Sequence, residues 1–551
     1  HDTFKDFRPV YSSTFSEDNL ANQESKYNKE TQLNNNSAVT SNYQVEQRLN
    51  YNTTIGRHKL DAMVAMTYEK NSSEGINAFK RKALGNDEIY QILDAQTAGD
   101  NTSGGKETSS MLSYLGRINY VYDDRYLATV NFRADGSSRF AKRNRWGYFP
   151  SVSLGWRVSN EEFFKNLNIE NTISNLKLRV GWGQNGNQRI DRDAPLTLIG
   201  TNNENQWYFG NGYSQGYVPT YVGNADIKWE TSQQTNVGLD MSFFKNSLDV
   251  SMDFYVKKTS DMLLNMPIPS FGAFPNSPFF NAGDLKNTGF EIEVRSSNIQ
   301  TKDFSWTTSL NLSHNKNKIV KLADLPEFID GNYIRKEGCS YATIYLREYA
   351  GVDPNDGRPM YYDNKEDENG NRSRNIVYDP NDADRVELKD IYPKLTGGLM
   401  NTFNYKFIDL SFNLSFHLGG YSYDGAMYAL QDDGYTAQYN KSTELRRRWK
   451  QPGDITDVPR YVYGQEYGGW WNSSRGIHST DHLRLKSLIV GVSAPQSWLR
   501  TIGINSARIY FSGTNLLTWA AYDQYDPELN GIVSYFTPPL KTFAFGLELK
   551  F

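Results

Sequence analysis

Two groups of aromatic side chains are the best candidates for binding a ligand. Aromatic rings offer large apolar faces that lose water easily, and polar residues beside them can satisfy the hydroxyls of a sugar. The alternative is that these rings pack loop against loop, contact a partner protein or lie at a membrane surface. We expect ligand contacts from Trp207, Tyr208 and Tyr213 in the first group and from Tyr467, Trp470 and Trp471 in the second.

A third candidate site is acidic. Asp353, Asn355 and Asp356 lie close together in a polar segment, and calcium takes about six to eight oxygen ligands. The spacing lacks the closing glutamate of an EF-hand loop, and Asp, Asn, Pro and Gly also favour solvated turns. We therefore expect no cofactor, with a structural calcium ion at these three residues as the one metal hypothesis.

Hydrolytic chemistry requires a nucleophile or an activated water beside a histidine that a carboxylate holds in place. His478 and His482, which flank Asp481, are the one suggestive group, and no serine motif lies beside them. The single cysteine, Cys339, excludes a disulfide framework and a cysteine-rich metal site. The sequence therefore predicts that the chain is not an enzyme.

The composition indicates which elements position these residues. The 551 residues are 38% hydrophobic but 14% aromatic, with a mean hydropathy of −0.67. No segment approaches the roughly 20 apolar residues of a membrane helix. A transmembrane barrel combines these features, because each strand is apolar on one face only. The net charge of −4 gives no indication of a nucleic-acid partner.

Apolar residues recur with a period of two. Phe543, Phe545, Leu547 and Leu549 alternate with small or charged residues, and successive side chains of a strand face opposite ways. Most such segments have about the 9–11 residues that a tilted strand needs to cross a bilayer. We predict about fifteen strands, near 42–54, 59–69, 110–122, 126–134, 148–158, 175–183, 232–243, 247–257, 287–296, 304–315, 395–406, 408–418, 482–493, 505–516 and 541–551.

The connections between these strands alternate between short and long. Outer-membrane barrels have short periplasmic turns and long extracellular loops. The segment 159–174 is the main exception on the short side and is a candidate for a short helix. A β-solenoid would show a fixed repeat, and a soluble sandwich would have polar outward faces. The predicted fold is therefore all-β, a transmembrane antiparallel β-barrel, with long loops near 70–109, 184–231, 258–286, 316–394 and 419–481.

The strand count suggests that the chain is one part of a barrel. Fifteen is odd, whereas single-chain bacterial barrels close with an even number of strands. The first predicted strand, near 42–54, also runs in the same direction as the last. We therefore expect that the N-terminal part of the barrel is missing and that His1 lies in or near an extracellular loop.

Several motifs resemble the SusC/RagA family of TonB-dependent outer-membrane transporters. They keep the family's order over nearly the whole chain, which makes the resemblance specific. They are 115–120 (LGRINY), 124–128 (DRYLA), 133–140 (RADGSSRF), 147–151 (GYFPS), 155–157 (GWR), 176–179 (LKLR), 181–186 (GWGQNG), 229–231 (WET), 287–291 (NTGFE), 483–486 (LRLK) and 513–516 (GTNL).

The resemblance implies a 22-stranded barrel with an N-terminal plug domain, and barrels of this size have a plugged lumen. Residues 1–551 would be its C-terminal strands, from the eighth to the twenty-second. The plug, the TonB-contacting segment and the first strands would lie outside this sequence. The expected location is the outer membrane, in contact with its lipid.

The resemblance also implies partners and cargo. The partners are a SusD-like lipoprotein that covers the extracellular mouth as a lid, the TonB–ExbB–ExbD complex, and other surface lipoproteins that bind or cleave glycans. The resemblance leaves open whether two transporter–lid pairs form a dimer. The predicted function is TonB-energised import of oligosaccharides, captured between the lid and loops near 203–222 and 460–475. The alternatives are import of oligopeptides, a passive porin and an adhesin.

Overall fold

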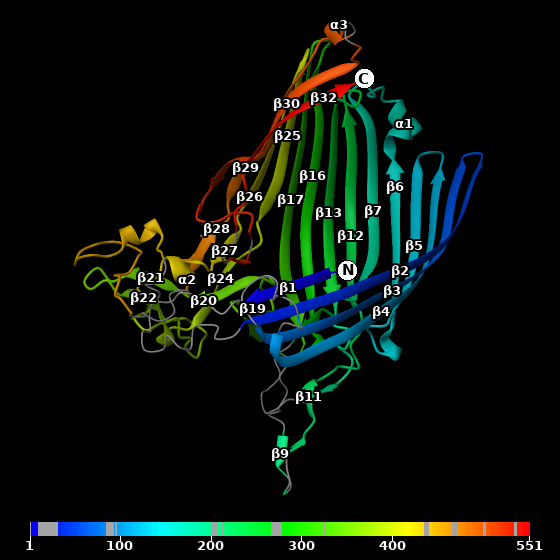
Figure 1. The fold of residues 1–551 in the computed structure, drawn as a ribbon. Helices are drawn as coiled ribbons and strands as arrows, with labels where there is room; N and C mark the ends of the chain where they lie inside the picture. Colours follow the sequence, from blue (N-terminus) through cyan, green and yellow to red (C-terminus); the bar gives the residue numbers. More distant parts are fainter. Residues whose placement is uncertain are drawn as a thin grey trace.

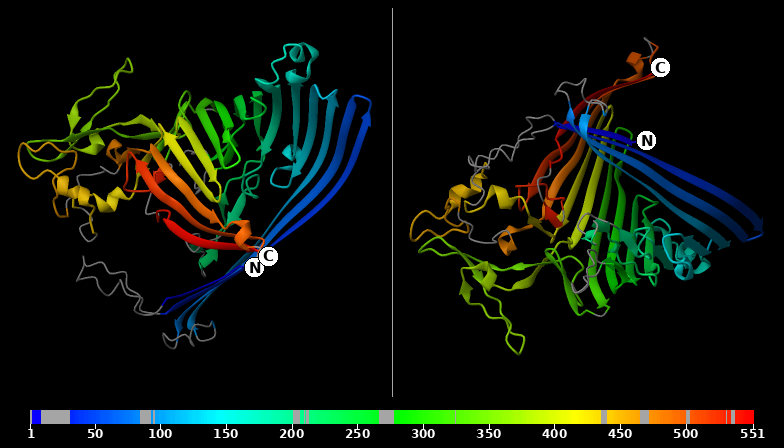
Figure 2. Two further views of the ribbon diagram at one scale, coloured as in Figure 1. Left: turned by 90° about the horizontal axis from the view of Figure 1, so that it is seen from above. Right: turned by 60° about the horizontal axis from the view of Figure 1, so that its bottom comes forward.

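A 16-stranded antiparallel sheet forms the body of the protein in a computed structural model. The sheet curves around an interior and has β1 and β32 as its edges (Figures 1 and 2). The structure describes residues 2–8, 31–83, 93, 96–200, 206–208, 210, 213–265, 278–323, 325–434, 440–464, 472–499, 503–529, 531–533 and 537–551. The strands of the sheet are β1 (Asp2–Arg8), β2 (Gln32–Ile55), β3 (His58–Ala83), β4 (Gln96–Tyr122), β5 (Tyr126–Ser137), β6 (Trp146–Arg157), β7 (Ile173–Asn187), β12 (Glu230–Phe243), β13 (Leu248–Ser260), β16 (Gly283–Gln300), β17 (Phe304–Leu322), β25 (Leu395–Tyr405), β26 (Ile408–Leu418), β29 (His482–Ser493), β30 (Ser506–Ala520) and β32 (Thr542–Lys550).

Each of the fifteen predicted strands corresponds to one strand of this sheet, in the predicted order. The predicted strand near 42–54 is confirmed as part of β2, but it is not the first strand of the sheet, because β1 precedes it and pairs with β2 over Gln32 to Ala38. The argument from an odd strand number therefore does not hold. β1 lies beside the extracellular end of β2, and His1 itself is outside the described residues.

The period of two in the sequence becomes two chemically different faces of the sheet. In β32, Phe543, Phe545 and Leu547 are 62%, 82% and 64% exposed. Such exposure of large apolar side chains in neighbouring strands marks a surface made for a nonaqueous environment. The opposite face, which turns towards the interior, carries small and charged residues such as Gly546 and Glu548. No helix in the described part of the chain is long and apolar enough to span a membrane.

Short turns connect the strands at one end of the sheet and long segments connect them at the other (Figure 1). In the turn between β4 and β5, Asp123 and Asp124 have φ angles of 51° and 49°. Left-handed residues at both central positions give a turn whose twist matches that of the flanking strands. The predicted helix in 159–174 is confirmed as α1 (Glu162–Lys165), which lies at the short-turn end.

The long segments are more ordered than the sequence indicated. The predicted loop near 70–109 is largely a β-hairpin, since β3 and β4 stay paired from His58 and Tyr122 out to Ala83 and Gln96. Small sheets occupy other loops. Their strands are β8 (Leu198–Gly200) with β11 (Val218–Tyr221), β9 (Gln206–Tyr208) with β10 (Tyr213–Gln215), β14 (Leu263–Asn265) with β15 (Phe279–Asn281), β18 (Glu327–Asp330) with β19 (Tyr333–Lys336), β20 (Thr343–Arg347) and β24 (Arg385–Asp390), β21 (Tyr349–Val352) with β22 (Pro359–Tyr362) and β23 (Ile376–Val377), and β27 (Tyr421–Asp424) with β28 (Ile477–Ser479) and β31 (Gly531–Val533).

A buried apolar cluster anchors one of these loops to the inner face of the sheet. Phe149 of β6 packs edge-on against Trp229, with ring centroids 5.5 Å apart. A Cβ at Gly186 of β7 would lie 2.1 Å from the Phe149 ring, so only glycine allows this close approach. The indole of Trp229 also donates a hydrogen bond to the Arg145 carbonyl at 3.0 Å. Three of the motifs named above, around 149, 186 and 229, therefore meet in one place.

Candidate functional site

Three of the predicted ligand-binding aromatics lie in the long connection between β7 and β12. Trp207 and Tyr208 are in β9 and Tyr213 is in β10, and the register places Tyr213 opposite Tyr208. Figure 1 shows β9 at the far end of a projection beyond the sheet. The contacts of these three residues with a ligand stay a prediction. Tyr467, Trp470 and Trp471 lie outside the described residues, so their assignment stays a prediction.

The acidic segment forms a turn. Asp353 accepts hydrogen bonds from the backbone N–H of Asn355 at 2.8 Å and from the Tyr378 hydroxyl at 2.6 Å, one on each carboxylate oxygen. These hydrogen bonds lower the pKa of the Asp353 carboxyl. Asp356 pairs with Arg358 at 2.6 Å. Within the described ranges, no group of three or more His, Cys, Asp or Glu residues is placed to hold a metal ion. The geometry matches the turn alternative, and the calcium site stays a hypothesis.

The histidines suggested by the sequence do not form a catalytic group with Asp481. His478 stacks on Tyr522 with ring centroids 3.7 Å apart, and burial lowers its pKa to about 4. His482 instead contacts the carbonyl oxygen of Thr480 at 2.8 Å. The Asp481 carboxylate accepts a hydrogen bond from the backbone N–H of Gly419. The side chains of His478, His482 and Asp481 therefore contact three different partners, although the residues are close in the sequence.

Three long connections join into one extracellular assembly. β27 and β28 come from the connection between β26 and β29, and β31 comes from the connection between β30 and β32. Buried Ile344, Leu346 and Tyr423 link this sheet to the connection between β17 and β25. Because an exposed loop would have no such core, this packing makes three loops of the mouth a single unit.

Polar contacts reinforce the assembly at Asp424, the last residue of β27. Its carboxylate accepts a hydrogen bond from the Tyr522 hydroxyl at 2.8 Å and one from the backbone N–H of Ala426 at 2.9 Å. Burial raises the pKa of Asp424, because the low-dielectric surroundings disfavour its charged form. The hydroxyls of Ser422 and Tyr525 also meet here. Residues 521–525 are thus held against β27.

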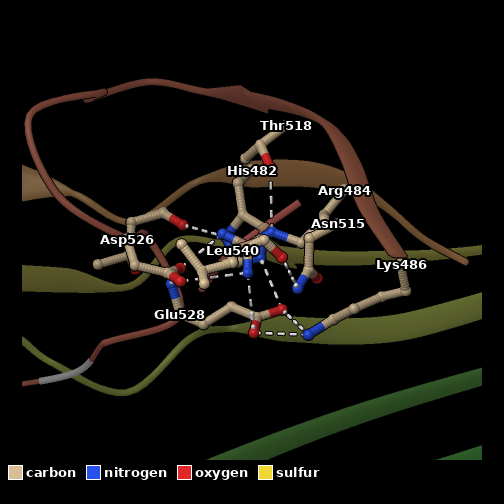
Figure 3. Close-up of polar contacts among 9 residues, drawn as sticks. His482, Arg484, Lys486, Asn515, Thr518, Asp526, Glu528 and Leu540 are labelled. Carbon is tan, nitrogen blue, oxygen red and sulfur yellow. Dashed lines mark hydrogen bonds and ion pairs between the residues drawn. The ribbon is translucent and has the colours of Figure 1, made fainter. Parts of the chain in front are cut away.

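A network of charged side chains ties the same loop to the inner wall of the sheet (Figure 3). Arg484 of β29 donates to Asp526 at 2.5 and 3.3 Å and to the Thr518 hydroxyl at 3.0 Å. Glu528 bridges Arg484 at 3.2 Å and Lys486 at 2.5 Å. The side chains of Arg484 and Asp526 are only 4% and 6% exposed. We call Arg484, Lys486, Asp526 and Glu528 the loop-to-wall network.

Arg484 and Lys486 of the loop-to-wall network lie in one of the motifs of the family resemblance, whereas Asp526 and Glu528 lie in none of them. His482, Arg484 and Lys486 recur at every second position of a predicted strand, so the period of two alone places them on one face. That signal was sufficient to assign them to the polar interior. No local pattern identifies Asp526 and Glu528 as their partners, because the pairing depends on how the intervening loop folds.

The inner wall is polar along much of its length. Arg179 of β7 is 2.8 Å from both Asp240 of β12 and Asp253 of β13. Arg508 of β30 lies 2.6 Å from Asp409 of β26. The wall can therefore face water and hydrogen-bond to a polar solute, whereas its outer face cannot.

Comparisons with known proteins agree with this architecture. The family model described as "TonB dependent receptor-like, beta-barrel" matches residues 2–335. "TonB-dependent receptor P3" of Formosa agariphila is 32% identical over 93% of this chain and 52% of its own length. "TonB-dependent receptor SusC" of Bacteroides thetaiotaomicron is 33% identical over 80% of this chain and 44% of its own length. The chain thus spans about half the length of the curated relatives it matches.

Among solved structures, the RagAB peptide transporter is similar with a TM-score of 0.81 and 26% identity. The match covers 94% of this chain and 56% of that one. The RagAB peptide importer in its "open-open" state matches with a TM-score of 0.80 and the same identity.

Proposed function

Because the chain belongs to the TonB-dependent receptor-like β-barrel family, we propose that it supplies the wall and mouth of an importer driven by TonB. The protein is located in the outer membrane, where its apolar outer face contacts lipid. Members of this family are receptors and transporters rather than enzymes. The observation that carries the proposal is a polar inner wall that continues beneath a packed assembly of extracellular loops.

We propose that the whole protein is longer than this sequence. A plug domain and the first strands of a 22-stranded barrel would precede residues 1–551, and the plug would receive the pull of TonB, ExbB and ExbD. A SusD-like lipoprotein would cover the mouth. The lengths of the relatives, about twice that of the matched region, support this arrangement.

The proposed cargo is an oligosaccharide, captured between the lid and the loops near 203–222 and 460–475. The aromatic residues of these loops, Trp207, Tyr208, Tyr213, Tyr467, Trp470 and Trp471, support this assignment through their chemistry. Import of oligopeptides is the second candidate, and the similarity to the RagAB peptide transporter favours it.

Purification of the full-length protein from outer membranes, with mass spectrometry of what accompanies it, tests the proposal. We expect a SusD-like lipoprotein, a plug-bearing N-terminal portion and bound glycan. Recovery of a plugless barrel alone would contradict import and favour a porin or an adhesin. The double substitution Trp470→Ala, Trp471→Ala should weaken cargo binding or lid association and leave assembly intact. Ile455→Ala, at an exposed residue of the same connection but outside 460–475, is the control.

A further inference from the structure

A group of exposed lysines lies on the outer face of the sheet. Its members, which we call the lysine patch, are Lys258 of β13, Lys286 of β16, and Lys316 and Lys318 of β17. Lys258 shares the face of Phe254 and Val256, because every second side chain of a strand points the same way. Figure 1 shows the three strands side by side in the middle of the sheet. The patch is therefore remote from both edges of the sheet, and a plug in the interior would leave it uncovered.

The lysine patch lies at the extracellular border of the apolar surface. The outward residues of β13 are Leu248, Val250, Met252, Phe254 and Val256, followed by Lys258. The run from Leu248 to Val256 has about the length that a tilted strand needs to cross a bilayer. It starts at the short turn before β13 and ends towards the long connection after it. Lys258 is therefore at the level of the lipid head groups of the outer leaflet.

The register of the strands places three of the lysines directly opposite one another. Lys258 pairs with Lys286, and Lys286 pairs with Lys318. Lys316 is two positions from Lys318, opposite Thr288. Because neighbouring strands are about 4.8 Å apart, the three opposed lysines span about 10 Å. Like charges at directly opposed positions destabilise a sheet, so an anion shared between these lysines would stabilise it.

The protein supplies little negative charge to offset the lysine patch. Asp284 lies 3.1 Å from Lys258, and β13, β16 and β17 carry no other carboxylate on this face. In the part of the chain that the structure describes, the other three lysines have no carboxylate within ion-pairing distance. The connection from β13 to β16 contains one charged residue, Asp261, which pairs with Lys228 at 3.0 Å. Four lysines against one carboxylate leave three positive charges uncompensated.

The positive charge is confined to these three strands. In the row of Lys258, the next position on β12 is Gln233, and the position beyond it on β7 is Gln184. Both are uncharged. Lysines at a membrane border can extend their ammonium groups to water without a specific partner, but that role would suit every strand equally. A patch limited to three neighbouring strands indicates a localised anionic ligand.

We propose that the lysine patch binds the phosphate groups of an acidic glycolipid of the outer leaflet. Lysine ammonium groups bind phosphate as point charges, and basic clusters at the border of an apolar surface attract anionic lipid head groups. The acyl chains of the same lipid would cover the apolar residues below. Among these, Phe254 is 59% exposed and Val256 is 45% exposed, and Phe254 is opposite Phe290.

The lipid is thus held at its head group and along its chains, whereas a free phosphate would meet only the lysines. The inference uses the location of the protein in the outer membrane. It does not depend on the identity of the imported cargo.

Native mass spectrometry of the full-length protein with its lipoprotein, in detergent, tests the inference. The probes are bisphosphorylated lipid A, the same lipid A without its phosphates, and inorganic phosphate. We expect bisphosphorylated lipid A to bind most tightly and excess inorganic phosphate not to displace it. Lys286→Gln with Lys318→Gln should weaken this binding about tenfold, because two of the three uncompensated charges are lost. Lys286→Arg with Lys318→Arg keeps the charges and should retain the binding.

Lys245→Gln with Lys302→Gln is the matched control. These lysines lie in the short turns between β12 and β13 and between β16 and β17, so the same charge is removed at the periplasmic end. Equal weakening in this control would overturn the assignment to the patch, and equal binding of lipid A without phosphates would overturn the inference. Displacement by inorganic phosphate would overturn the assignment to a lipid.

Thermal unfolding in detergent gives a second readout that also reports folding. Without lipid A, the double glutamine variant should unfold at no lower temperature than the unaltered protein, because the substitutions remove like-charge repulsion. Added bisphosphorylated lipid A should raise the unfolding temperature of the unaltered protein more than that of the variant. An equal rise in both proteins would overturn the inference.

Discussion

Arg484 and Asp526 form an ion pair through two hydrogen bonds, of 2.5 and 3.3 Å, although the residues are 42 positions apart in the chain. Both side chains are almost fully buried. Burying two charges costs solvation free energy, which good geometry and further hydrogen bonds must offset. Thr518 and Glu528 supply those further contacts to Arg484. The pair fixes the loop between β30 and β32 to the inner wall.

Removing one member of this pair should release the loop. Asp526→Ala leaves the buried Arg484 without its main partner, a change that costs about 3–5 kcal/mol for buried pairs. Hydrogen exchange of residues 521–529 should become much faster, while exchange in β29 and β30 changes little. Asp523→Ala is the control, because within the described residues the side chain of Asp523 accepts a hydrogen bond only from the neighbouring Gln524. Replacing both partners, Arg484→Met with Asp526→Leu, should restore part of the protection.

The two faces of β6 should respond oppositely to a new charge. Leu154 is exposed on the apolar face, and Ser153 lies on the opposite, interior face. Leu154→Arg should destabilise the protein in lipid by about 2–4 kcal/mol, the cost of arginine near the bilayer midplane. Ser153→Arg should cost far less. Urea-induced unfolding of the full-length protein in vesicles measures both, and equal costs would refute the assignment of the faces.

The extracellular sheet of β18, β19, β20 and β24 should loosen in acid. Burial alone would raise the pKa of Glu387, but hydrogen bonds from Lys336 and Arg372, at 2.9 and 2.8 Å, outweigh it and lower the pKa to about 2. A lowered pKa contributes stability above the unfolded value of 4.5, and this stability is lost as the pH falls towards 2.

We therefore expect Glu387→Gln to weaken hydrogen-exchange protection of residues 327–347 at pH 6, after correction for intrinsic rates. The difference from the unaltered protein should shrink between about pH 4.5 and pH 2. Glu366→Gln removes a more exposed carboxylate that contacts the same Arg372, at 2.8 Å, and should have a smaller effect. A difference that stays constant with pH would exclude the ion pair as its cause.

Removal of calcium should leave the acidic turn unchanged. Both carboxylate oxygens of Asp353 already accept hydrogen bonds, from Asn355 and Tyr378. Exchange rates of residues 353–378 with and without a calcium chelator are thus expected to coincide. Faster exchange in the chelator, reversed by added calcium and absent in Asp353→Asn, would instead support the calcium hypothesis.

Much of the sheet follows from local sequence. Alternation such as that of Phe543, Phe545 and Leu547 is required wherever a strand has lipid on one side and water on the other, so the fifteen such strands could be predicted. β1 has no such alternation, since its two phenylalanines, Phe4 and Phe7, are three positions apart. Its strand conformation depends on pairing with β2. The outer parts of β3 and β4 are mostly polar and lack this alternation, so the sequence predicts a loop there.

The arrangement of the extracellular loops at the mouth depends on tertiary structure. The period of two is enough to place Arg484 and Lys486 on one face of a strand, because side-chain direction in a strand is a local property. It could not pair them with Asp526 and Glu528, and it could not separate Asp481 from the histidines on either side. Contacts between loops join residues tens of positions apart, and their geometry is set by backbone pairing such as that of β27 with β31. Sequence therefore determined the wall and its two faces, whereas the folded loops determined which charges meet.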